Sequence, residues 1–279
     1  MDDLKVYTLM VLMLRANTVA VSPSETMKAV ATIINIILIL TGLHHRLTFR
    51  PLGLLRDLGV QMKVKLQVAL DLIDLNQALI IGREALEGGA DIVEAGTPLI
   101  KKFGMEAVKA LRSAFPDVTI VADMKTMDAG ALEAEMALIA GADIVTVMAL
   151  APEETIIEAL DKARELGGKV MVDLMNVTDV RNVALRMKEL RADYLCLHVG
   201  IDVQKRRGVS PEQLCREISE VSSILPNRVA VAGGIKAETA PKYAKAGASI
   251  IIVGGAITRS SNPREATKRI KEAIRRALR

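Results

Sequence analysis

The feature that most constrains the fold is a regular alternation of strand-like and helix-like stretches between Met62 and Arg279. Eight short runs rich in Val, Ile, Leu and Ala are each followed by a stretch whose apolar residues recur at helical spacing. Strands that alternate with helices pair in parallel, because each helix returns the chain to the same end of the sheet. Eight such units in this length predict an α/β protein with a closed (β/α)8 barrel (a TIM barrel), in a single domain over residues 62–279.

The predicted strands are bounded by glycine-rich or polar turns. They cover Lys65–Leu70, Ala90–Val93, Val118–Val121 with Asp123 at its end, Asp143–Val147, Lys169–Asp173, Tyr194–His198, Arg228–Ala232 and Ser249–Val253. The predicted helices cover Leu75–Glu87, Met105–Ala114, a segment ending at Gly141, a segment from Pro152 to Gly167, Asp179–Leu190, Pro211–Ile224, Ala237–Ala246 and a last helix from Pro263. A short loop with Gly96 and Pro98 is expected after the second strand.

Three charged side chains are concentrated in the stretch VADMKTMDAG, at the end of the third predicted strand. Side chains alternate along a strand, so Asp123 and Lys125 are expected to point to the same side. Asp128 stands where the next helix should begin, a position at which Asp often caps the helix. An Asp–Lys pair beside a helix cap could be an ordinary surface feature. Its place at the carboxyl end of a barrel strand, where barrels carry their active sites, favours a catalytic role.

Further polar residues end other predicted strands: Asp71 the first, Glu94 the second, Asp173 the fifth and His198 the sixth. Carboxylates crowded at one rim repel each other and shift each other's pKa values, which is a poor choice for stability alone. A divalent cation would relieve this repulsion, and oxygen ligands such as Glu94 and Asp123 suit Mg²⁺. His198 could be a structural histidine or a catalytic one.

Glycine pairs end the last two predicted strands, Gly233 with Gly234 and Gly254 with Gly255. Without side chains, their backbone N–H groups can approach a phosphate closely, and barrels often bind phosphate after the seventh and eighth strands. The pairs could instead be simple tight turns. Arg259 follows closely and could assist the phosphate or be an ordinary surface cation.

Cysteine usage and charge limit the compartment and the partners. Cys196 and Cys215 are the two cysteines, and their spacing is not that of a metal site, which fits a reducing cytoplasm. The net charge is +4 without one obvious basic patch. The basic stretch Lys268–Arg279 is typical of a last amphipathic helix with cations near its C-terminus. We therefore expect a cytoplasmic protein without a nucleic-acid partner.

Residues 1–61 differ from the rest of the chain, because they are apolar without a clear period. The run Ala29–Leu43 is shorter than the ~20 residues of a membrane-spanning helix. Three interpretations compete: a membrane-associating or signal-like segment, extra packed helices, or upstream sequence included by a mis-assigned start. The third is favoured, since the orderly pattern begins directly after Met62, and a membrane partner is not expected. The adjacent His44 and His45 lack further candidate ligands nearby.

The motif D-x-K-x-x-D, formed by Asp123, Lys125 and Asp128, resembles the signature of the orotidine 5′-phosphate decarboxylase superfamily of barrels. Within it, VADMKTMDAG, DIVEAGTPLI, LHVGIDVQ, VAGGI and IIVGGAIT look most like the 3-hexulose-6-phosphate synthase family. The resemblance covers about residues 62–261. Sister 3-keto-L-gulonate-6-phosphate decarboxylases usually carry an arginine in the last phosphate loop, where this chain has Gly255. The sequence contexts of Glu94 and His198 separate it from true orotidylate decarboxylases.

The resemblance implies an Mg²⁺-dependent lyase that condenses formaldehyde with ribulose 5-phosphate, or cleaves the product, through a metal-stabilised enediolate. It would work in the ribulose monophosphate pathway of one-carbon metabolism. The implied roles are metal binding for Glu94 and Asp123, sugar binding for Asp71 and Lys125, proton transfer for His198, and phosphate binding for Gly233, Gly234, Gly254 and Gly255. Asp128 would enter the neighbouring subunit's site, so a homodimer is implied.

Three alternatives remain open from the residues. The same barrel could decarboxylate 3-keto-L-gulonate 6-phosphate or orotidine 5′-phosphate. Lys125 could form a Schiff base with the substrate, although Asp123 and Asp128 favour a lysine that stays protonated. The barrel could also be a regulatory protein that binds a sugar phosphate without turning it over.

Overall fold

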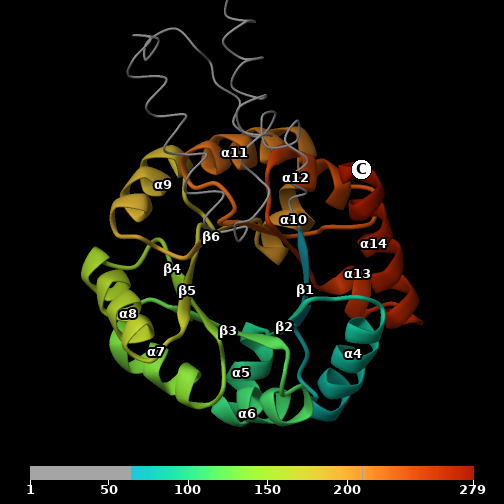
Figure 1. The fold of residues 1–279 in the computed structure, drawn as a ribbon, viewed down its shortest axis with the longest axis horizontal. Helices are drawn as coiled ribbons and strands as arrows, with labels where there is room; N and C mark the ends of the chain where they lie inside the picture. Colours follow the sequence, from blue (N-terminus) through green and yellow to red (C-terminus); the bar gives the residue numbers. More distant parts are fainter. Residues whose placement is uncertain (1–63, 209) are drawn as a thin grey trace, which may run out of the picture. The chain divides into compact units, whose positions relative to one another are not determined.

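The described residues of this computed structural model, 64–208 and 210–279, form a closed barrel of parallel strands in the order β1 to β8 (Figure 1). The predicted (β/α)8 barrel is thus confirmed. By its internal contacts the chain divides into two units, Met1–Met62 and Lys63–Arg279. The apolar run Ala29–Leu43, the His44–His45 pair and the start at Met62 lie outside the described residues.

Strands and helices alternate around the ring, and helices surround the strands on all sides (Figure 1). The strands are β1 (Lys65–Leu70), β2 (Ile92–Ala95), β3 (Thr119–Thr126), β4 (Ile144–Met148), β5 (Lys169–Asp173), β6 (Tyr194–His198), β7 (Val229–Ala232) and β8 (Ile250–Val253). The helices are α4 (Leu75–Glu87), α5 (Thr97–Phe103), α6 (Met105–Ala114), α7 (Gly130–Ile139), α8 (Glu153–Glu165), α9 (Val180–Glu189), α10 (Ile201–Arg207), α11 (Pro211–Ile224), α12 (Ala240–Ala246), α13 (Gly255–Thr258) and α14 (Pro263–Leu278).

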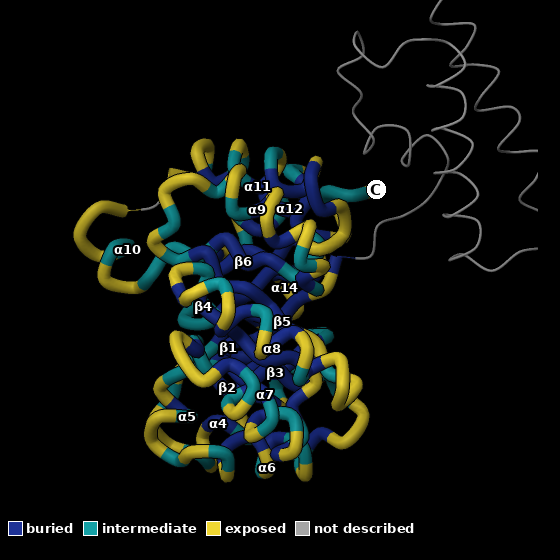
Figure 2. Tube along the Cα trace, turned by 90° about the vertical axis from the view of Figure 1, so that its left-hand side faces the viewer, coloured by how far each residue is buried: buried dark blue, intermediate teal, exposed yellow. Residues whose placement is uncertain are grey.

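Each strand contributes to two separate apolar layers. On β1, Leu66, Val68 and Leu70 face outward and pack against the helices, while Ala69 faces the inside of the barrel. Because both faces of a parallel strand are covered, the strands are almost continuously apolar. Figure 2 shows the result, with the strands buried at the centre and exposure concentrated on the outer surfaces of the helices.

Aspartates at the entrance of three strands tie the barrel together at the end opposite the glycine pairs. Asp91, Asp143 and Asp193 each accept a hydrogen bond from a backbone N–H of the preceding strand, at 2.7, 2.7 and 3.0 Å. Asp91 and Asp143 follow Gly-Ala and Asp193 follows Arg-Ala, so the turn before each of these strands also supplies a contact to the neighbouring strand. Lys271 of α14 is almost fully buried and forms an ion pair with Asp91, which fixes the last helix to the first two strands.

The third strand differs from the prediction in a way that shapes the site. It does not end at Asp123 but continues to Thr126, and its register against β4 shifts between Ala122 and Thr126. Lys125 lies inside this irregularity with a positive φ of 49°. The prediction that Asp128 caps the next helix is wrong: the N-cap is Ala129, in the left-handed conformation with φ 53°, and no side chain caps α7. A bulged strand end thus precedes α7 in place of a regular strand followed by a capped helix.

Three short helices were not predicted. The expected loop around Gly96 and Pro98 is the start of α5, α10 follows β6, and α13 begins at Gly255. All three begin directly after a glycine and lie at the ends of strands. Among the described residues, no helix has the length and apolar character needed to cross a membrane.

Candidate active site

A cavity of about 870 Å³ lies over the carboxyl ends of the strands. Of the residues predicted for the site, it brings together Asp71, Glu94, Asp123, Lys125, His198, Gly233, Gly234, Gly254 and Gly255. Arg259 also lines it. Residues up to 188 positions apart in the sequence share this cavity because all strands point their carboxyl ends to one side of the barrel.

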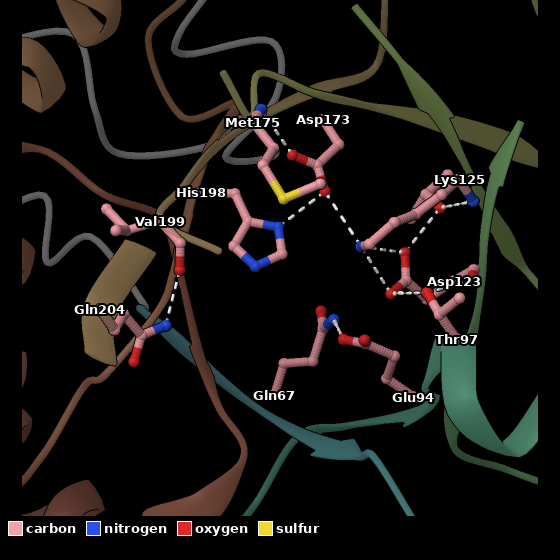
Figure 3. A network of polar contacts seen from close by, with 11 residues as sticks. Gln67, Glu94, Thr97, Asp123, Lys125, Asp173, Met175, His198, Val199 and Gln204 are labelled. Carbon is pink, nitrogen blue, oxygen red and sulfur yellow. Dashed lines mark hydrogen bonds and ion pairs between the residues drawn. The ribbon is translucent and has the colours of Figure 1, made fainter. Parts of the chain in front are cut away.

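Asp123 and Lys125 form an ion pair at the floor of the cavity (Figure 3). Lys125 Nζ lies 3.0 and 2.8 Å from the two carboxylate oxygens of Asp123, and 3.3 Å from Asp173 Oδ2. Burial alone would lower the pKa of Lys125, but the carboxylates of Asp123 and Asp173 raise it above its ordinary value. Lys125 is therefore a fixed positive charge at neutral pH.

Asp173 connects this ion pair to His198. His198 Nδ1 lies 2.7 Å from Asp173 Oδ2, and Asp173 Oδ1 accepts the Met175 N–H at 2.9 Å (Figure 3). Burial by itself would raise the pKa of Asp173, yet the hydrogen bond and charge of His198, with Lys125, hold it below its ordinary value. An ionised Asp173 accepts a hydrogen bond from the Nδ1–H of His198, so that the other ring nitrogen is the one available to the cavity.

Glu94 sits beneath the cavity among like charges. Burial raises the pKa of Glu94 well above its ordinary value, and Asp123 and Asp71 raise it further, against the opposing effect of Lys125. Asp71 lies at the rim, where desolvation of its carboxyl group by the surrounding protein and the charge of Asp123 also raise its pKa. Gln67 Nε2 donates a hydrogen bond to Glu94, while Gln67 Oε1 is buried and has no hydrogen-bond partner among the described residues.

This donor set fits a divalent cation. Carboxylates that resist ionisation together gain from a positive ion between them, and Mg²⁺ commonly uses one or two carboxylates with water and substrate as the other ligands. No group of three or more His, Cys, Asp and Glu side chains is arranged for metal binding within residues 64–208 and 210–279. Glu94 and Asp123 would therefore need oxygens from a substrate or from water.

The glycine pairs shape the opposite wall of the cavity. Gly233 and Gly234 have positive φ values of 107° and 66°, which favour glycine. A side chain at Gly255 would collide with the guanidinium of Arg259. The loop after β8 thus has an arginine beside it, because the guanidinium of Arg259 lies next to Gly255. Backbone N–H groups that no side chain covers, together with a nearby guanidinium, can bind a phosphate.

Asp128 is not brought into the cavity of its own chain. It is exposed, its Oδ1 accepts the Ala129 N–H at 2.8 Å, and it is absent from the residues that line the cavity. The short segment with the left-handed Ala129 carries it away from Lys125.

Sequence reasoning missed three polar residues that hold the charged ones in place. Thr97 Oγ1 lies 2.7 Å from Asp123 Oδ2, Thr146 Oγ1 lies 2.8 Å from Asp123 Oδ1, and Gln67 contacts Glu94. Two of them had a visible signal, because Gln67 and Thr146 are polar residues in the middle of otherwise apolar strands. Thr97 had none, since its contact depends on α5.

Comparisons with known proteins find relatives of the barrel. The family model of the orotidine 5′-phosphate decarboxylase / HUMPS family matches residues 64–270. A 3-hexulose-6-phosphate synthase of Mycobacterium gastri is 39% identical over 211 residues, which cover 76% of this chain and all of that protein. The family match begins at residue 64, so it does not include residues 1–63.

Two similar solved structures differ in how much of their sequence they share with this chain. A crystal structure of 3-hexulose-6-phosphate synthase is similar with a TM-score of 0.72 and 40% identity, covering 76% of this chain and 100% of the other. A 3-keto-L-gulonate-6-phosphate decarboxylase from Vibrio cholerae has a TM-score of 0.68 and 28% identity, covering 77% and 98%. The backbone is shared by both, whereas the sequence is closer to the first.

Proposed function

This chain belongs to the orotidine 5′-phosphate decarboxylase / HUMPS family, and on that premise we propose that it is a 3-hexulose-6-phosphate synthase. It is a lyase that joins formaldehyde to ribulose 5-phosphate, or runs the reverse cleavage. The observation that carries the proposal is the hydrogen-bonded row His198–Asp173–Lys125–Asp123, which faces the glycine loops across one cavity. Enolisation of a sugar phosphate requires a group that accepts a proton and a cation that stabilises the enediolate oxygen, both placed away from the site that binds the phosphate. His198 and Lys125 would supply the first two, and the glycine loops the third.

The substrate is held at its phosphate end by the loops after β7 and β8. The backbone N–H groups of Gly234 and Gly255 and the guanidinium of Arg259 are the donors available there. Phosphate binding fixes the direction of the sugar, so that its carbonyl end extends toward Lys125. Asp71 at the rim would accept hydrogen bonds from sugar hydroxyls.

The reaction begins with loss of a proton from carbon 1 of ribulose 5-phosphate. His198 takes that proton on the ring nitrogen not bound to Asp173, and the electron pair forms an enediolate. Lys125 stabilises the negative oxygen. Carbon 1 then attacks the carbon of formaldehyde, and the carbon–oxygen π bond of formaldehyde breaks as the new carbon–carbon bond forms. The former formaldehyde oxygen takes up the proton that His198 removed, which restores His198. Because its neighbours keep Lys125 charged, it acts as a cation and not as a Schiff-base nucleophile.

Mg²⁺ is part of the proposal, with Glu94 and Asp123 as its protein ligands. When bound, it would supply positive charge to the oxygens of carbons 1 and 2 as a Lewis acid. Support comes from the raised pKa of Glu94, which reflects a buried carboxylate that lacks sufficient positive charge nearby. Gln67 occupies one oxygen of Glu94.

A homodimer is also proposed, and an exposed apolar stripe on α7 supports it. Leu132, Met136 and Ile139 are 57, 46 and 71% exposed, and Met127 in the preceding segment is 48% exposed. These residues recur at helical spacing on one side of α7. Asp128 is exposed beside Met127, where a second copy packed on the stripe would receive it. The free state of Cys196 and Cys215 supports the further proposal of a cytoplasmic protein.

One observation keeps a second candidate open, namely decarboxylation of 3-keto-L-gulonate 6-phosphate. The sister decarboxylases usually carry an arginine in the last phosphate loop where this chain has Gly255, yet Arg259 supplies a guanidinium beside Gly255. The two reactions share an enediolate, so the loop alone does not separate them.

The test is turnover by the full chain with ribulose 5-phosphate, Mg²⁺ and formaldehyde, followed by loss of formaldehyde. We expect consumption that a chelator stops and that Asp123→Ala abolishes. Asp117→Ala is the control, since Asp117 is an exposed residue in the turn before β3, at the other end of the barrel. Folded protein that consumes no formaldehyde but releases carbon dioxide from 3-keto-L-gulonate 6-phosphate or orotidine 5′-phosphate would replace the synthase with a decarboxylase.

A further inference from the structure

We propose that Thr146 is a positioning residue that holds Asp123 and Lys125 in their reactive arrangement. Thr146 lies on β4, is 4% exposed and does not line the cavity. It therefore acts on the reaction through its neighbours and not through the substrate. The inference rests on the proposed function for its kinetic consequence, but not for its structural one.

The hydroxyl of Thr146 joins the two charged residues at once. It accepts the backbone N–H of Lys125 at 3.0 Å, and it lies 2.8 Å from Asp123 Oδ1. An amide N–H can only donate, so the hydroxyl oxygen accepts from Lys125 and its single hydrogen donates to Asp123 Oδ1. Thr146 thus has one orientation that satisfies both partners.

The hydroxyl also acts where the backbone is irregular. Between Ala122 and Thr126 the pairing of β3 with β4 changes register, and Lys125 has a φ of 49°. A left-handed conformation of a residue other than glycine is strained and persists only where its surroundings hold it. The hydrogen bond from Lys125 N–H to Thr146 is such a restraint.

This irregularity is what allows Lys125 to turn back onto Asp123. Lys125 Nζ contacts both oxygens of Asp123 and also reaches Asp173. Two residues apart on a regular strand, the side chains would run parallel to each other. Without the hydroxyl, we expect the strand to relax and the ammonium group to leave the position at which it meets the enediolate.

Thr97 offers a comparison within the same site. Its hydroxyl lies 2.7 Å from Asp123 Oδ2 and 3.0 Å from the backbone carbonyl oxygen of Asp123, but it comes from α5 and does not touch the Lys125 N–H. Loss of that hydroxyl removes contacts to Asp123 and leaves the hydrogen bond from Lys125 N–H to Thr146 in place. A larger effect at Thr146 than at Thr97 would therefore report the restraint on Lys125.

The experiment compares Thr146→Val, Thr146→Ser and Thr97→Val in the full chain. Valine keeps the shape of threonine without the hydroxyl, and serine keeps the hydroxyl. We expect kcat to fall about 10²-fold in Thr146→Val, the scale of a small misplacement of reacting groups. KM for ribulose 5-phosphate should stay nearly constant, Thr97→Val should lose less, and Thr146→Ser should recover most of kcat. In a crystal structure of Thr146→Val, Lys125 should leave the left-handed region.

Thr267→Val is the matched control, because Thr267 on α14 is equally buried and its hydroxyl donates to Pro263 O at 2.7 Å. It should lose stability without losing kcat. An unchanged kcat in Thr146→Val, or an unchanged φ at Lys125, would overturn the inference. If Thr146→Val does not fold, Thr146→Ala against Thr146→Ser decides in the same way. If the wild-type protein consumes no formaldehyde, only the proposed function is contradicted. The crystal structure of Thr146→Val would still show whether Thr146 restrains the backbone of Lys125.

Discussion

His198 and Asp173 form a hydrogen-bonded pair across adjacent strands, with Nδ1 2.7 Å from Oδ2 (Figure 3). The pair orients the imidazole and determines which of its nitrogens faces the cavity. Asp173 also contacts Lys125, at 3.3 Å, so one carboxylate orients both the proposed base and the proposed oxyanion stabiliser.

Replacement of Asp173 by asparagine should disable proton transfer while leaving the fold intact. An amide can donate to Nδ1 and so favour the tautomer whose proton faces the substrate. We expect Asp173→Asn to lower kcat by about 10²–10⁴-fold, the range of general acid–base catalysis. Exchange of the carbon 1 proton of ribulose 5-phosphate with deuterated water, followed by NMR, should fall in parallel. Asp193→Asn, at the opposite end of the barrel, is the control. Exchange at the wild-type rate in Asp173→Asn would contradict the assigned role.

The raised pKa of Glu94 predicts how stability depends on pH in metal-free protein. The folded state holds the proton more tightly than the unfolded chain, so the stabilisation is complete below the unfolded pKa of about 4.3. It is lost as the pH rises through the folded pKa. We therefore expect Glu94→Gln to gain stability relative to wild type as the pH rises above the unfolded pKa. Urea unfolding in the presence of a chelator measures this.

Added Mg²⁺ provides the second half of that test. It should raise the free energy of unfolding of wild type at neutral pH and leave Glu94→Gln nearly unchanged. The opposite result would be a wild-type free energy of unfolding that, in the presence of a chelator, exceeds that of Glu94→Gln by an amount that grows with pH. It would show that the protein itself stabilises the charged form of Glu94 without a metal.

Arg259 should contribute to binding more than to chemistry. Hydrogen bonds to charged groups contribute roughly 1.5–3 kcal/mol, so loss of the guanidinium over Gly255 should raise KM about tenfold or more. We expect Arg259→Met to raise KM for ribulose 5-phosphate with a smaller change in kcat, and to weaken inhibition by inorganic phosphate. Arg275→Met, an exposed arginine in the last turn of α14, should change neither quantity. A fall in kcat alone would place Arg259 in the chemistry.

Sites shared between two copies should show complementation. Asp128→Asn and Lys125→Met should each be nearly inactive, yet a heterodimer of the two would have one site with neither substitution. Mixing the unfolded variants and refolding them together should restore part of the activity. No recovery in a mixture shown to contain heterodimer would place Asp128 outside the neighbouring site.

The apolar stripe on α7 gives an independent test of the same assembly. Met136→Glu should convert the protein to a folded monomer in light scattering, with activity lost, because Met136 lies in the exposed stripe. Glu135→Gln, at the neighbouring position of α7, should remain a dimer. An active Met136→Glu monomer would contradict a site completed by the second copy.

Local patterns were enough to predict the barrel and most of its rim. The bounds of β1, β5 and β6 match the prediction because each is an apolar run that ends at a turn or at a polar residue of the site. Carboxyl ends of parallel strands meet at one rim, so listing their last residues located Asp71, Glu94, Asp123 and His198 in one cavity.

What could not be predicted depends on register and on backbone irregularity. The contacts of Thr146 and Thr97 with Asp123 join residues 23 and 26 positions apart, and their geometry follows from how neighbouring strands and α5 are aligned. The bulge at Lys125 leaves no residue signature, since lysine does not favour a positive φ. The expected cap at Asp128 failed for the same reason, because the chain turns at Ala129 instead.

The most direct test of carbon–carbon bond formation follows the carbon atom of labelled formaldehyde. The full chain is incubated with carbon-13 formaldehyde, ribulose 5-phosphate and Mg²⁺, and the products are followed by NMR. We expect the label to become the hydroxymethyl carbon of a hexulose 6-phosphate, bonded to the former carbon 1. We expect Lys125→Met to form no labelled hexulose 6-phosphate. Label that remains in free formaldehyde, with folded protein that still binds ribulose 5-phosphate, would contradict the proposed carbon–carbon bond formation.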